Sequence, residues 1–409
     1  MDASPSIEEK RGVAHAATGG SAWEVFGVFL RLGLTSFGGP IAHLGYFRDE
    51  LVTRRQWVDD AGYADLVALC QFLPGPASSQ VGFALGLRRA GYAGALAAWA
   101  GFTLPSALLL AAFALGAATF SGPRGAGVLH GLKVVAVAVV AQAVWGMGRT
   151  LAPDRVRAAI AVGAIFLVVF TGGTVGQLAA IAVGGLAGLL LCREETRAIG
   201  GHLLSPVSRR AGMAALVLFV ALLAALPLAS SHHQAIALFD AFYRAGALVF
   251  GGGHVVLPLL QAEVVTPGWV GADVFLAGYG AAQAVPGPLF TFAAYLGAVM
   301  VPEPNGLAGA TTALVAVFLP GLLLVVGALP YWDAFRRHRW AQATMRGANA
   351  AVVGILGAAL YSPVWTSAIE SPRDFALAVA AFVLLAAWKT PPWIVVVLGA
   401  AGGVFAAWL

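Results

Sequence analysis

Apolar residues run along this chain in long stretches that hold few charges, from about residue 23 to the end. Hydropathy divides them into about thirteen segments, many near the roughly 20 residues that a helix needs to cross a bilayer. One segment stands alone between two sets of six, after the polar stretch 193–210. The pattern predicts an all-α polytopic membrane protein with segments near 23–44, 63–87, 91–118, 131–149, 157–172, 175–192, 211–229, 235–260, 273–300, 307–330, 347–362, 374–388 and 391–408.

Two motifs occur once in each set of six segments. Phe37–Gly39 is repeated as Phe250–Gly252, 213 positions later (250 − 37). Gln71–Pro76, which reads Gln-Phe-Leu-Pro-Gly-Pro, is repeated in pattern as Gln283–Pro288, 212 positions later (283 − 71). Such internal similarity indicates a duplicated architecture.

The duplication divides the chain into two structural repeats. Six segments and one odd segment precede the second repeat, and this odd number gives it the opposite orientation in the membrane. If each segment from the third onward crosses the bilayer once, the arginines of 149–157, 193–210 and 336–346 all lie on the same side. The positive-inside rule makes that side cytoplasmic. We therefore expect a polar tail at 1–21, a first repeat at 22–192, a linker with an orientation-inverting helix at 193–232 and an inverted second repeat at 233–409.

Proline and glycine interrupt the apolar sequence at the motifs. Pro74 and Pro76 lack a backbone N–H and Gly75 can take a positive φ, so no regular helix continues through them. At membrane depth such a break is tolerated only where the freed backbone groups are buried in protein or line a wet cavity. Matching breaks in the two halves therefore predict a transport site.

The first two segments of each repeat can be interpreted in two ways. If both span the bilayer, Arg48, Arg54 and Arg55 lie outside. If both are re-entrant hairpins that turn at the motifs, these residues join Arg88 and Arg89 on the cytoplasmic side, as the positive-inside rule prefers. We favour the hairpins, and the spanning alternative stays open.

Composition supports a membrane protein and excludes several other classes. The chain is 59% hydrophobic and 11% charged, against roughly 25% charged residues in soluble domains. Its net charge of +5 reflects arginines in short loops, and no basic stripe with interleaved aromatics suggests nucleic acid. Cys70 and Cys192 form no metal or disulfide pattern, and residues 1–21 lack the apolar core of a signal peptide. Without a Walker A motif, zinc-binding cluster or nucleophile elbow, we expect no enzyme, cofactor, metal site or ATP-driven transport by this chain alone.

Two arginines inside apolar segments are the first candidates for contact with an anion. Arg31 and Arg244 each lie six residues before a Phe-Gly-Gly motif. A charge within a membrane segment is a functional-site hypothesis by default, and a guanidinium offers a fork of donors that suits a tetrahedral oxyanion. The alternative is a structural ion pair, with Glu24 for Arg31 and Asp240 for Arg244.

Backbone groups and amides at the breaks are the next candidates. Gly38, Gly39 and Gly251–Gly253 allow a helix to restart with free N–H groups toward an anion; the alternative is tight packing of helices through small residues. Gln71 and Gln283 precede the Pro-Gly-Pro breaks by three residues. Their amides donate to an oxyanion or seal a freed carbonyl.

Titratable side chains near the breaks are accessory candidates. His43 and His254 follow the glycine breaks, and Asp65 begins the second segment; a proton-coupled mechanism needs such a group, although each also fits a structural role. Lys133 and Asn349 occupy equivalent positions, so only one repeat supplies a cation there. Lys133 could instead extend to the membrane surface.

The paired motifs resemble those of the chromate ion transporter family in its long, two-domain form, and the resemblance covers about residues 22 to 409. It implies an inner-membrane carrier that expels chromate from bacteria and confers chromate resistance, with sulfate as the natural competitor. Together, the motifs and the charged candidates give these expected substrate-binding residues: Arg31, Phe37, Gly38, Gly39, Gln71, Pro74, Gly75, Pro76, Arg244, Phe250, Gly251, Gly252, His254, Gln283, Pro286, Gly287 and Pro288.

Several functions remain open at this stage. We favour a secondary transporter that exports chromate by alternating access. Sulfate or another oxyanion as the substrate, an anion channel, and a non-transporting scaffold or sensor are the alternatives. The expected partners are the anion, the lipid bilayer of the bacterial inner membrane, protons or a counter-anion as coupling ion, and a second copy of the chain in a homodimer.

Overall fold

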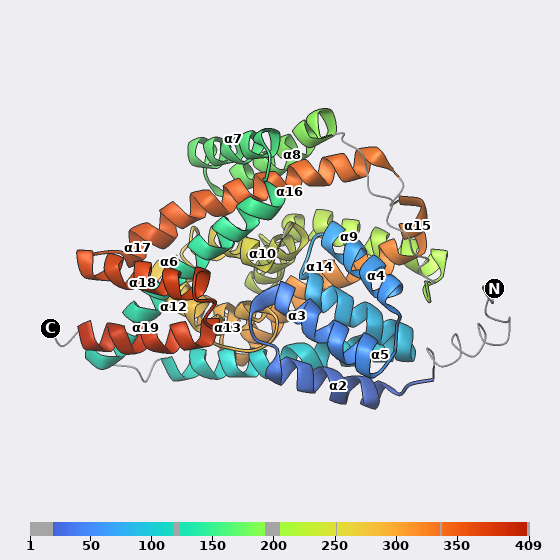
Figure 1. Cartoon of the computed structure of the whole chain (residues 1–409), viewed down its shortest axis with the longest axis horizontal. Coiled ribbons are helices and arrows are strands. Elements are labelled where there is room, and N and C mark those ends of the chain that lie inside the picture. Colours follow the sequence, from blue (N-terminus) through green and yellow to red (C-terminus); the bar gives the residue numbers. More distant parts are fainter. Residues whose placement is uncertain (1–18, 118–122, 193–204, 251, 336–337, 407–409) are drawn as a thin grey trace, which may run out of the picture.

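The computed structural model describes residues 19–117, 123–192, 205–250, 252–335 and 338–406, and every regular element within these ranges is a helix (Figure 1). The first part of the chain forms α2 (Ala22–Thr35), α3 (Gly39–Phe47), η1 (Arg48–Arg54), α4 (Asp60–Phe72), α5 (Ala77–Ala117), α6 (Pro123–Leu151), α7 (Arg155–Thr171), α8 (Gly173–Leu191) and α9 (Arg209–Ala229).

The second part begins after α9 and repeats the alternation of short and long helices. Its elements are α10 (Gln234–Ala247), η2 (Gly253–Val255), α11 (Val256–Val264), α12 (Ala272–Ala282), η3 (Leu289–Thr291), α13 (Phe292–Val299), α14 (Gly306–Ala328), η4 (Leu329–Tyr331), α15 (Trp332–Phe335), α16 (Arg339–Ala359), η5 (Leu360–Trp365), α17 (Thr366–Ala368), α18 (Pro372–Ala386) and α19 (Pro392–Ala406).

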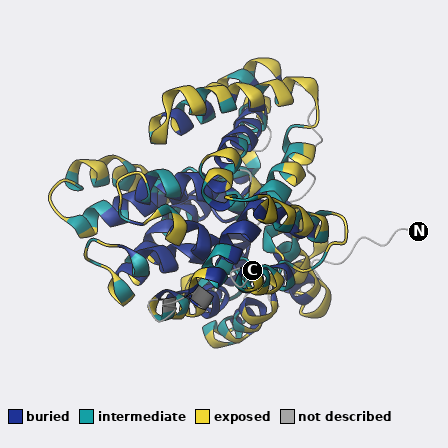
Figure 2. Ribbon diagram, turned by 90° about the vertical axis from the view of Figure 1, so that its left-hand side faces the viewer, coloured by how far each residue is buried: buried dark blue, intermediate teal, exposed yellow. Residues whose placement is uncertain are grey.

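The bundle is apolar on its outside as well as in its core. Figure 2 shows buried residues along the middle of the bundle and exposed residues on the outer helices. Helix α9 has a mean hydropathy of 2.5 over its most apolar window, yet only 11% of that window is buried within the protein. A helix of this kind faces lipid. Six described helical stretches are long and apolar enough to cross a membrane: Ala77–Gly116, Gly125–Leu151, Gly173–Leu191, Arg209–Ala229, Gly306–Ala334 and Arg339–Ala368.

The predicted all-helical membrane fold is therefore confirmed in its class. The count of about thirteen segments, the inversion of the second repeat and the boundaries of the repeats stay predictions. Most of the polar tail at 1–21 and much of the linker, including 193–204, lie outside the described residues, as does Gly251.

The helices are interrupted at the motifs, as the sequence predicts. Helix α2 ends at Thr35, and α3 begins after Gly38, whose φ is +103°. The Pro-Gly-Pro breaks lie between α4 and α5 and between α12 and η3, where Gly75 has φ +123° and Gly287 has φ +98°. These left-handed conformations strain any residue with a Cβ atom, so glycine permits each turn.

The breaks of one repeat are hydrogen-bonded to those of the other. The Gly75 N–H donates to the Val249 carbonyl oxygen (2.8 Å), and the Gly287 N–H donates to the Ser36 carbonyl oxygen (2.9 Å). Ser36 and Val249 each directly precede a Phe-Gly-Gly motif, so the two bonds are equivalent and reciprocal. Each repeat thus satisfies a backbone group of the other at its break, where an unpaired buried N–H would be costly.

Each Pro-Gly-Pro break also packs against the long helix of the other repeat. A Cβ atom on Gly75 would lie 3.0 Å from the Gly321 Cα in α14, and a Cβ atom on Gly287 would lie 2.9 Å from the Ser106 Oγ in α5. Gly321 and Ser106 both directly follow the proline inside their helix. Both contacts lie well inside these apolar helices, away from their ends.

The second and third segments of the first repeat form a tight helical hairpin. Helix α5 is interrupted at Ala90 and Gly91, whose backbone angles are not helical. Gly86 lies against Gly94 and Ala98 after this turn, although residues 86 and 98 of a straight helix would be about 18 Å apart. The chain therefore folds back on itself at Gly91.

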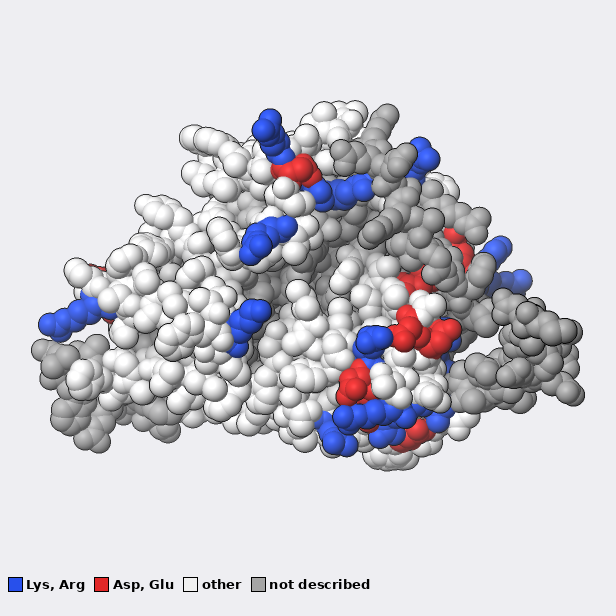
Figure 3. Space-filling view, viewed as in Figure 1, with Lys and Arg blue, Asp and Glu red and all other residues white. Residues whose placement is uncertain are grey.

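Charged and aromatic residues meet at the end of this hairpin. The Arg89 guanidinium lies over the Trp57 ring at 5.3 Å and pairs with Glu24 at the start of α2 (3.2 Å). Figure 3 shows acidic and basic side chains mixed over this end of the molecule, on an otherwise largely uncharged face. The positions of the second repeat that are equivalent to Trp57 and Arg89 are also in contact, because the Val301 N–H donates to the Trp269 carbonyl oxygen (3.0 Å).

We expect alanine at either Pro-Gly-Pro glycine to destabilise the protein by more than about 1 kcal/mol, since alanine disfavours a positive φ and its methyl group would press on the opposite repeat. Gly75→Ala and Gly287→Ala should therefore lower the thermal unfolding temperature of the purified protein. Gly163→Ala is the matched control, because Gly163 lies within helix α7 and a Cβ atom there meets no atom within 4 Å. Equal unfolding temperatures for all three variants would contradict this account of the breaks.

The contact between Arg89 and Trp57 at the end of the Gly91 hairpin also predicts which loops share a side of the membrane. The native cysteines, Cys70 and Cys192, are both buried and can be replaced by alanine. In that background Arg54→Cys and Arg88→Cys should resist a membrane-impermeant thiol reagent in intact cells and react in inside-out vesicles. Arg373→Cys, in the first turn of α18, should react in intact cells. Labelling of Arg54→Cys but not Arg88→Cys in intact cells would instead support spanning segments.

Candidate functional site

A cavity of about 450 Å³ lies where broken segments of the two repeats meet. The first repeat contributes the stretch from Phe37 to Pro40, which holds the glycine break before α3. The second repeat contributes the end of α12 and the break after it, and the wall is completed by α6 and by the connection between α18 and α19. Six of the predicted site residues line this cavity: Phe37, Gly38, Gly39, His254, Gln283 and Gly287.

The reciprocal backbone bond fixes the wall of the cavity. The Gly287 N–H donates to the Ser36 carbonyl oxygen, which holds the second repeat's break against the residue that precedes Phe37. Helix α3 begins at Gly39, and its N-cap Gly38 provides no side-chain hydrogen bond. The first N–H groups of α3 thus have no capping side chain, and the positive end of the helix dipole lies at the cavity wall.

A side chain that the sequence analysis did not single out, Lys389, brings a positive charge to the cavity. Lys389 lies between the end of α18 and the start of α19 and is exposed. It is the only Lys or Arg among the described lining residues, which include no Asp or Glu. No ion pair joins Lys389 to another residue in the described part of the chain.

Two neutral side chains of the second repeat also line the cavity. The Gln283 Nε2 is buried and has no hydrogen-bond partner within the described residues, so it can donate to a bound group. The Nδ1 of His254 lies 2.7 Å from the hydroxyl group of Tyr279. That contact orients the imidazole ring at the cavity wall.

The two predicted arginines lie elsewhere. Neither Arg31 nor Arg244 is among the residues that line the cavity. Arg244 Nη2 pairs with Asp240 Oδ2 (3.0 Å), the alternative considered from the sequence, and also with Glu263 Oε2 (2.9 Å). Arg31 is exposed on α2, and Glu24 pairs with Arg89 instead. Glu263 lies 19 residues from Arg244 along the chain, so the spacing of the sequence does not indicate it as a partner.

The remaining predicted residues that the structure describes do not line the cavity. Gln71 is exposed at the end of α4, and the Pro74 carbonyl accepts a hydrogen bond from Gln80 Nε2 (2.8 Å). His43 is buried, with Nδ1 3.3 Å from Ser78 Oγ, and Asp65 Oδ1 accepts from the Trp332 indole N–H (3.0 Å). The others outside the lining are Gly75, Pro76, Phe250, Gly252, Pro286, Pro288 and Asn349.

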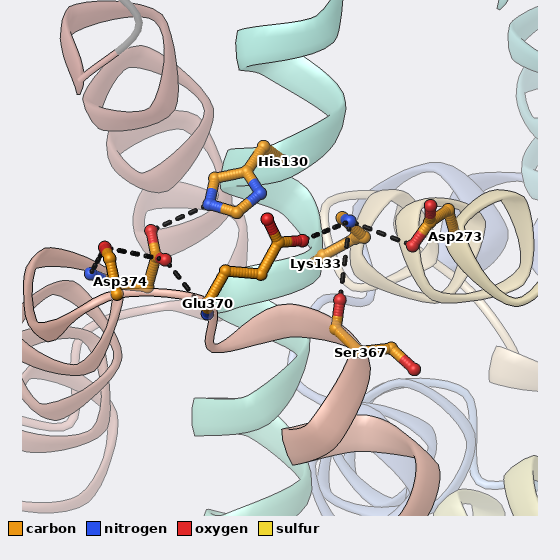
Figure 4. A network of polar contacts seen from close by, with 7 residues as sticks. His130, Lys133, Asp273, Ser367, Glu370 and Asp374 are labelled. Carbon is orange, nitrogen blue, oxygen red and sulfur yellow. Dashed lines mark hydrogen bonds and ion pairs between the residues drawn. The ribbon is translucent and has the colours of Figure 1, made fainter.

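Lys133 belongs to a polar network rather than to the cavity (Figure 4). Its Nζ lies 2.9 Å from Asp273 Oδ1 and 3.5 Å from Glu370 Oε1, and the side chain is only 10% exposed. One turn away on α6, His130 Nε2 lies 2.7 Å from Asp374 Oδ1. The network therefore ties α6 to the N-terminal ends of α12 and α18.

The same three helices extend from this network to the cavity. Val139 and Gln142 of α6 line the cavity, six and nine residues beyond Lys133, or about 9–14 Å at the rise of an α-helix. Helix α12 reaches the cavity at Ala282 and α18 at Leu385. The ion pairs thus join these helices at one end while the cavity lies between them further along.

Fold and site together define the class of protein. Long apolar helices with apolar outer faces, and broken segments that line a cavity between the two halves of the chain, are the features of a multi-pass membrane transporter. A family model described as "Chromate transporter" matches residues 23–189 and 236–404, two regions whose starts are 213 positions apart (236 − 23). The chain belongs to the chromate transporter family, as the paired motifs indicated.

Three curated relatives match the chain over nearly its whole length. It is 30% identical over 395 residues to the "Chromate transport protein" of Pseudomonas aeruginosa, covering 94% of this chain and 92% of the relative. The "Probable chromate transport protein" of Synechococcus elongatus is 29% identical, with 92% and 94% covered. The "Chromate transport protein" of Cupriavidus metallidurans is 28% identical, with 95% and 94% covered. No solved structure matches the chain.

The ion pairs of Arg244 predict a structural role for it in folding. Arg244→Gln leaves the carboxylates of Asp240 and Glu263, which are 3% and 8% exposed, without their counter-ion. Loss of one partner from a fully buried pair costs roughly 3–5 kcal/mol, and we expect less here because Arg244 is 31% exposed and solvent screens it. The amount of folded protein in the membrane should fall.

Removing the charges of Arg244 and of both its carboxylate partners should restore the amount of folded protein. The triple variant Asp240→Asn, Arg244→Gln, Glu263→Gln is expected to regain a normal level of folded protein, measured by fluorescence size-exclusion chromatography. Arg31→Gln is the matched control at the equivalent position, because Arg31 forms no ion pair within the described residues. A triple variant as poorly folded as Arg244→Gln alone would remove the ion-pair explanation.

Proposed function

We propose that this chain exports chromate across the bacterial inner membrane by secondary active transport and thereby confers chromate resistance. The observation that carries the proposal is the cavity between the breaks of the two repeats, which is lined by the glycine break before α3, the Gln283 amide and Lys389. The names of the three relatives, each a chromate transport protein or a probable one, supply the substrate.

The chemistry of the cavity suits a tetrahedral dianion. Such an ion is strongly hydrated, and its dehydration must be offset by hydrogen-bond donors and positive charge. Backbone N–H groups, an amide and an ammonium group provide both, and no lining residue within the described chain adds a negative charge. Sulfate has the same shape and charge as chromate, so we expect it to compete for the site.

Alternating access would use the two repeats as moving parts. In this proposal the repeats are inverted, and the first two segments of each repeat are re-entrant hairpins that meet near the middle of the bilayer. Opening on one side requires the ion pairs around Lys133 to separate, since they join α6, α12 and α18 at that end. Protons or a counter-anion would supply the coupling energy. An ion that binds one of the two access states more tightly would shift the population toward that state.

Expression in a chromate-sensitive bacterium provides the first test. Export predicts growth at chromate concentrations that arrest the control strain, together with less chromium inside the cells. Inside-out vesicles should take up chromate with saturation kinetics, and sulfate should inhibit that uptake. Gly287→Ala serves as the impaired comparison, at matched protein level.

Three outcomes would contradict parts of this proposal. Increased sensitivity to chromate would indicate uptake rather than export. Flux that rises linearly with concentration, without saturation, would indicate a channel. Sulfate transport without chromate transport would reassign the substrate while retaining the site.

A further inference from the structure

The cavity has one fixed positive charge that is not neutralised within the described chain. Three cations were expected from the sequence, and none of them lines the cavity: Arg244 and Lys133 each face two carboxylates, and Arg31 is exposed on α2. Lys389 lines the cavity and has no ion pair with a described residue. The positive charge available to a bound anion is therefore that of Lys389.

We propose that Lys389 binds the substrate and selects dianions, together with the amide of Gln283. This inference rests on the proposed function, because it takes the cavity as the substrate site. The unpartnered Gln283 Nε2 supplies a neutral donor, and the Lys389 ammonium group supplies three donors and the charge. Oxyanions of charge −2 are thus preferred over monoanions of the same shape, since the Coulomb attraction scales with the ion's charge.

The backbone at Lys389 supports a role for its side chain. Lys389 has φ +55°, a left-handed conformation that is uncommon for a residue with a Cβ atom. The C-terminal turn of α18 fixes this conformation, because the Thr390 N–H donates to the Leu384 carbonyl oxygen (2.9 Å). Glycine would satisfy the backbone with less strain, so packing alone does not account for a lysine here.

At the equivalent position the first repeat has a glycine, which adopts the left-handed conformation with less strain. Gly173-Thr174 corresponds to Lys389-Thr390 at an offset of 216 (389 − 173), the same offset that relates Gly131 to Gly347 (347 − 131). Gly173 has φ +54°, almost the same as that of Lys389. Both repeats therefore have a residue with positive φ at this position, and only the second repeat has a cation there.

This comparison provides a variant that removes the charge and relieves the strain. Lys389→Gly restores the residue used by the first repeat, so the protein should remain folded, with an unfolding temperature no lower than that of the wild type. Lys389→Asn provides a neutral side chain that also tolerates the left-handed region. Lys389→Arg keeps the charge. Arg373→Gln, at the other end of α18 and outside the cavity, is the control for loss of a cation.

The test measures equilibrium binding of radiolabelled chromate to purified protein in nanodiscs and saturable flux in vesicles. Lys389→Gly and Lys389→Asn should weaken chromate binding at least tenfold and raise the KM for flux, while Lys389→Arg retains more affinity and Arg373→Gln behaves as wild type. Gln283→Glu, which places a carboxylate of similar size in the cavity, should weaken binding as well.

Perchlorate, a tetrahedral monoanion, tests the selectivity. As a competitor it should lose less affinity than sulfate does when Lys389 is replaced. Equal losses for the two anions would overturn selection by charge. Wild-type chromate affinity in both Lys389→Gly and Lys389→Asn would overturn the site itself.

The proposed function and this inference can fail separately. Wild-type chromate export with unchanged affinity in the neutral Lys389 variants would retain the function and reject the inference. A wild-type protein that neither binds nor transports chromate, but binds sulfate in a manner that depends on Lys389, would reject the chromate assignment and support the inference.

Discussion

The structure depends on two backbone hydrogen bonds that cross between the repeats, from Gly75 to Val249 and from Gly287 to Ser36. Each break frees polar backbone groups inside apolar sequence, where an unpaired group costs several kcal/mol in hydrocarbon surroundings. Neither repeat satisfies these groups alone, because each donor's acceptor belongs to the other repeat. The cavity consequently exists only where the two repeats meet.

The cost of an unpaired polar group in apolar surroundings also applies to the charged side chains of the bundle. A cation inside an apolar bundle is costly unless it is paired or reaches water. Arg244 is paired with Asp240 and Glu263, and Lys133 with Asp273 and Glu370, so their charges serve to hold helices together. A cation that is to bind a mobile anion must instead lie in a hydrated cavity without a fixed partner.

Local chemistry made the breaks predictable from the sequence, and the long-range arrangement limited what else could be predicted. Proline and glycine act on their own backbone, so the breaks at Gly75 and Gly287 follow from residue type. The partner of a charge depends on the fold: Glu263 reaches Arg244 only after the chain turns back at the glycine break. Lys389 lies 106 positions from Gln283 (389 − 283), and its approach to the cavity needs the packing of α18 and α19.

A symmetric scaffold therefore carries an asymmetric site. Several backbone features occur in both repeats because the sequence is duplicated. They are the hydrogen bonds at the breaks, the contacts that close the hairpins, and the positive φ at Gly173 and Lys389. The charge at the cavity does not follow that symmetry: Lys389 comes from the second repeat, whereas the first repeat contributes the stretch from Phe37 to Pro40 and the uncharged side chains of Tyr46, Val139 and Gln142. Two equivalent cations at one site would repel each other in its empty state. A single cation among neutral donors avoids that repulsion and still attracts a dianion, which gives a physical reason for the repeats to differ at this turn.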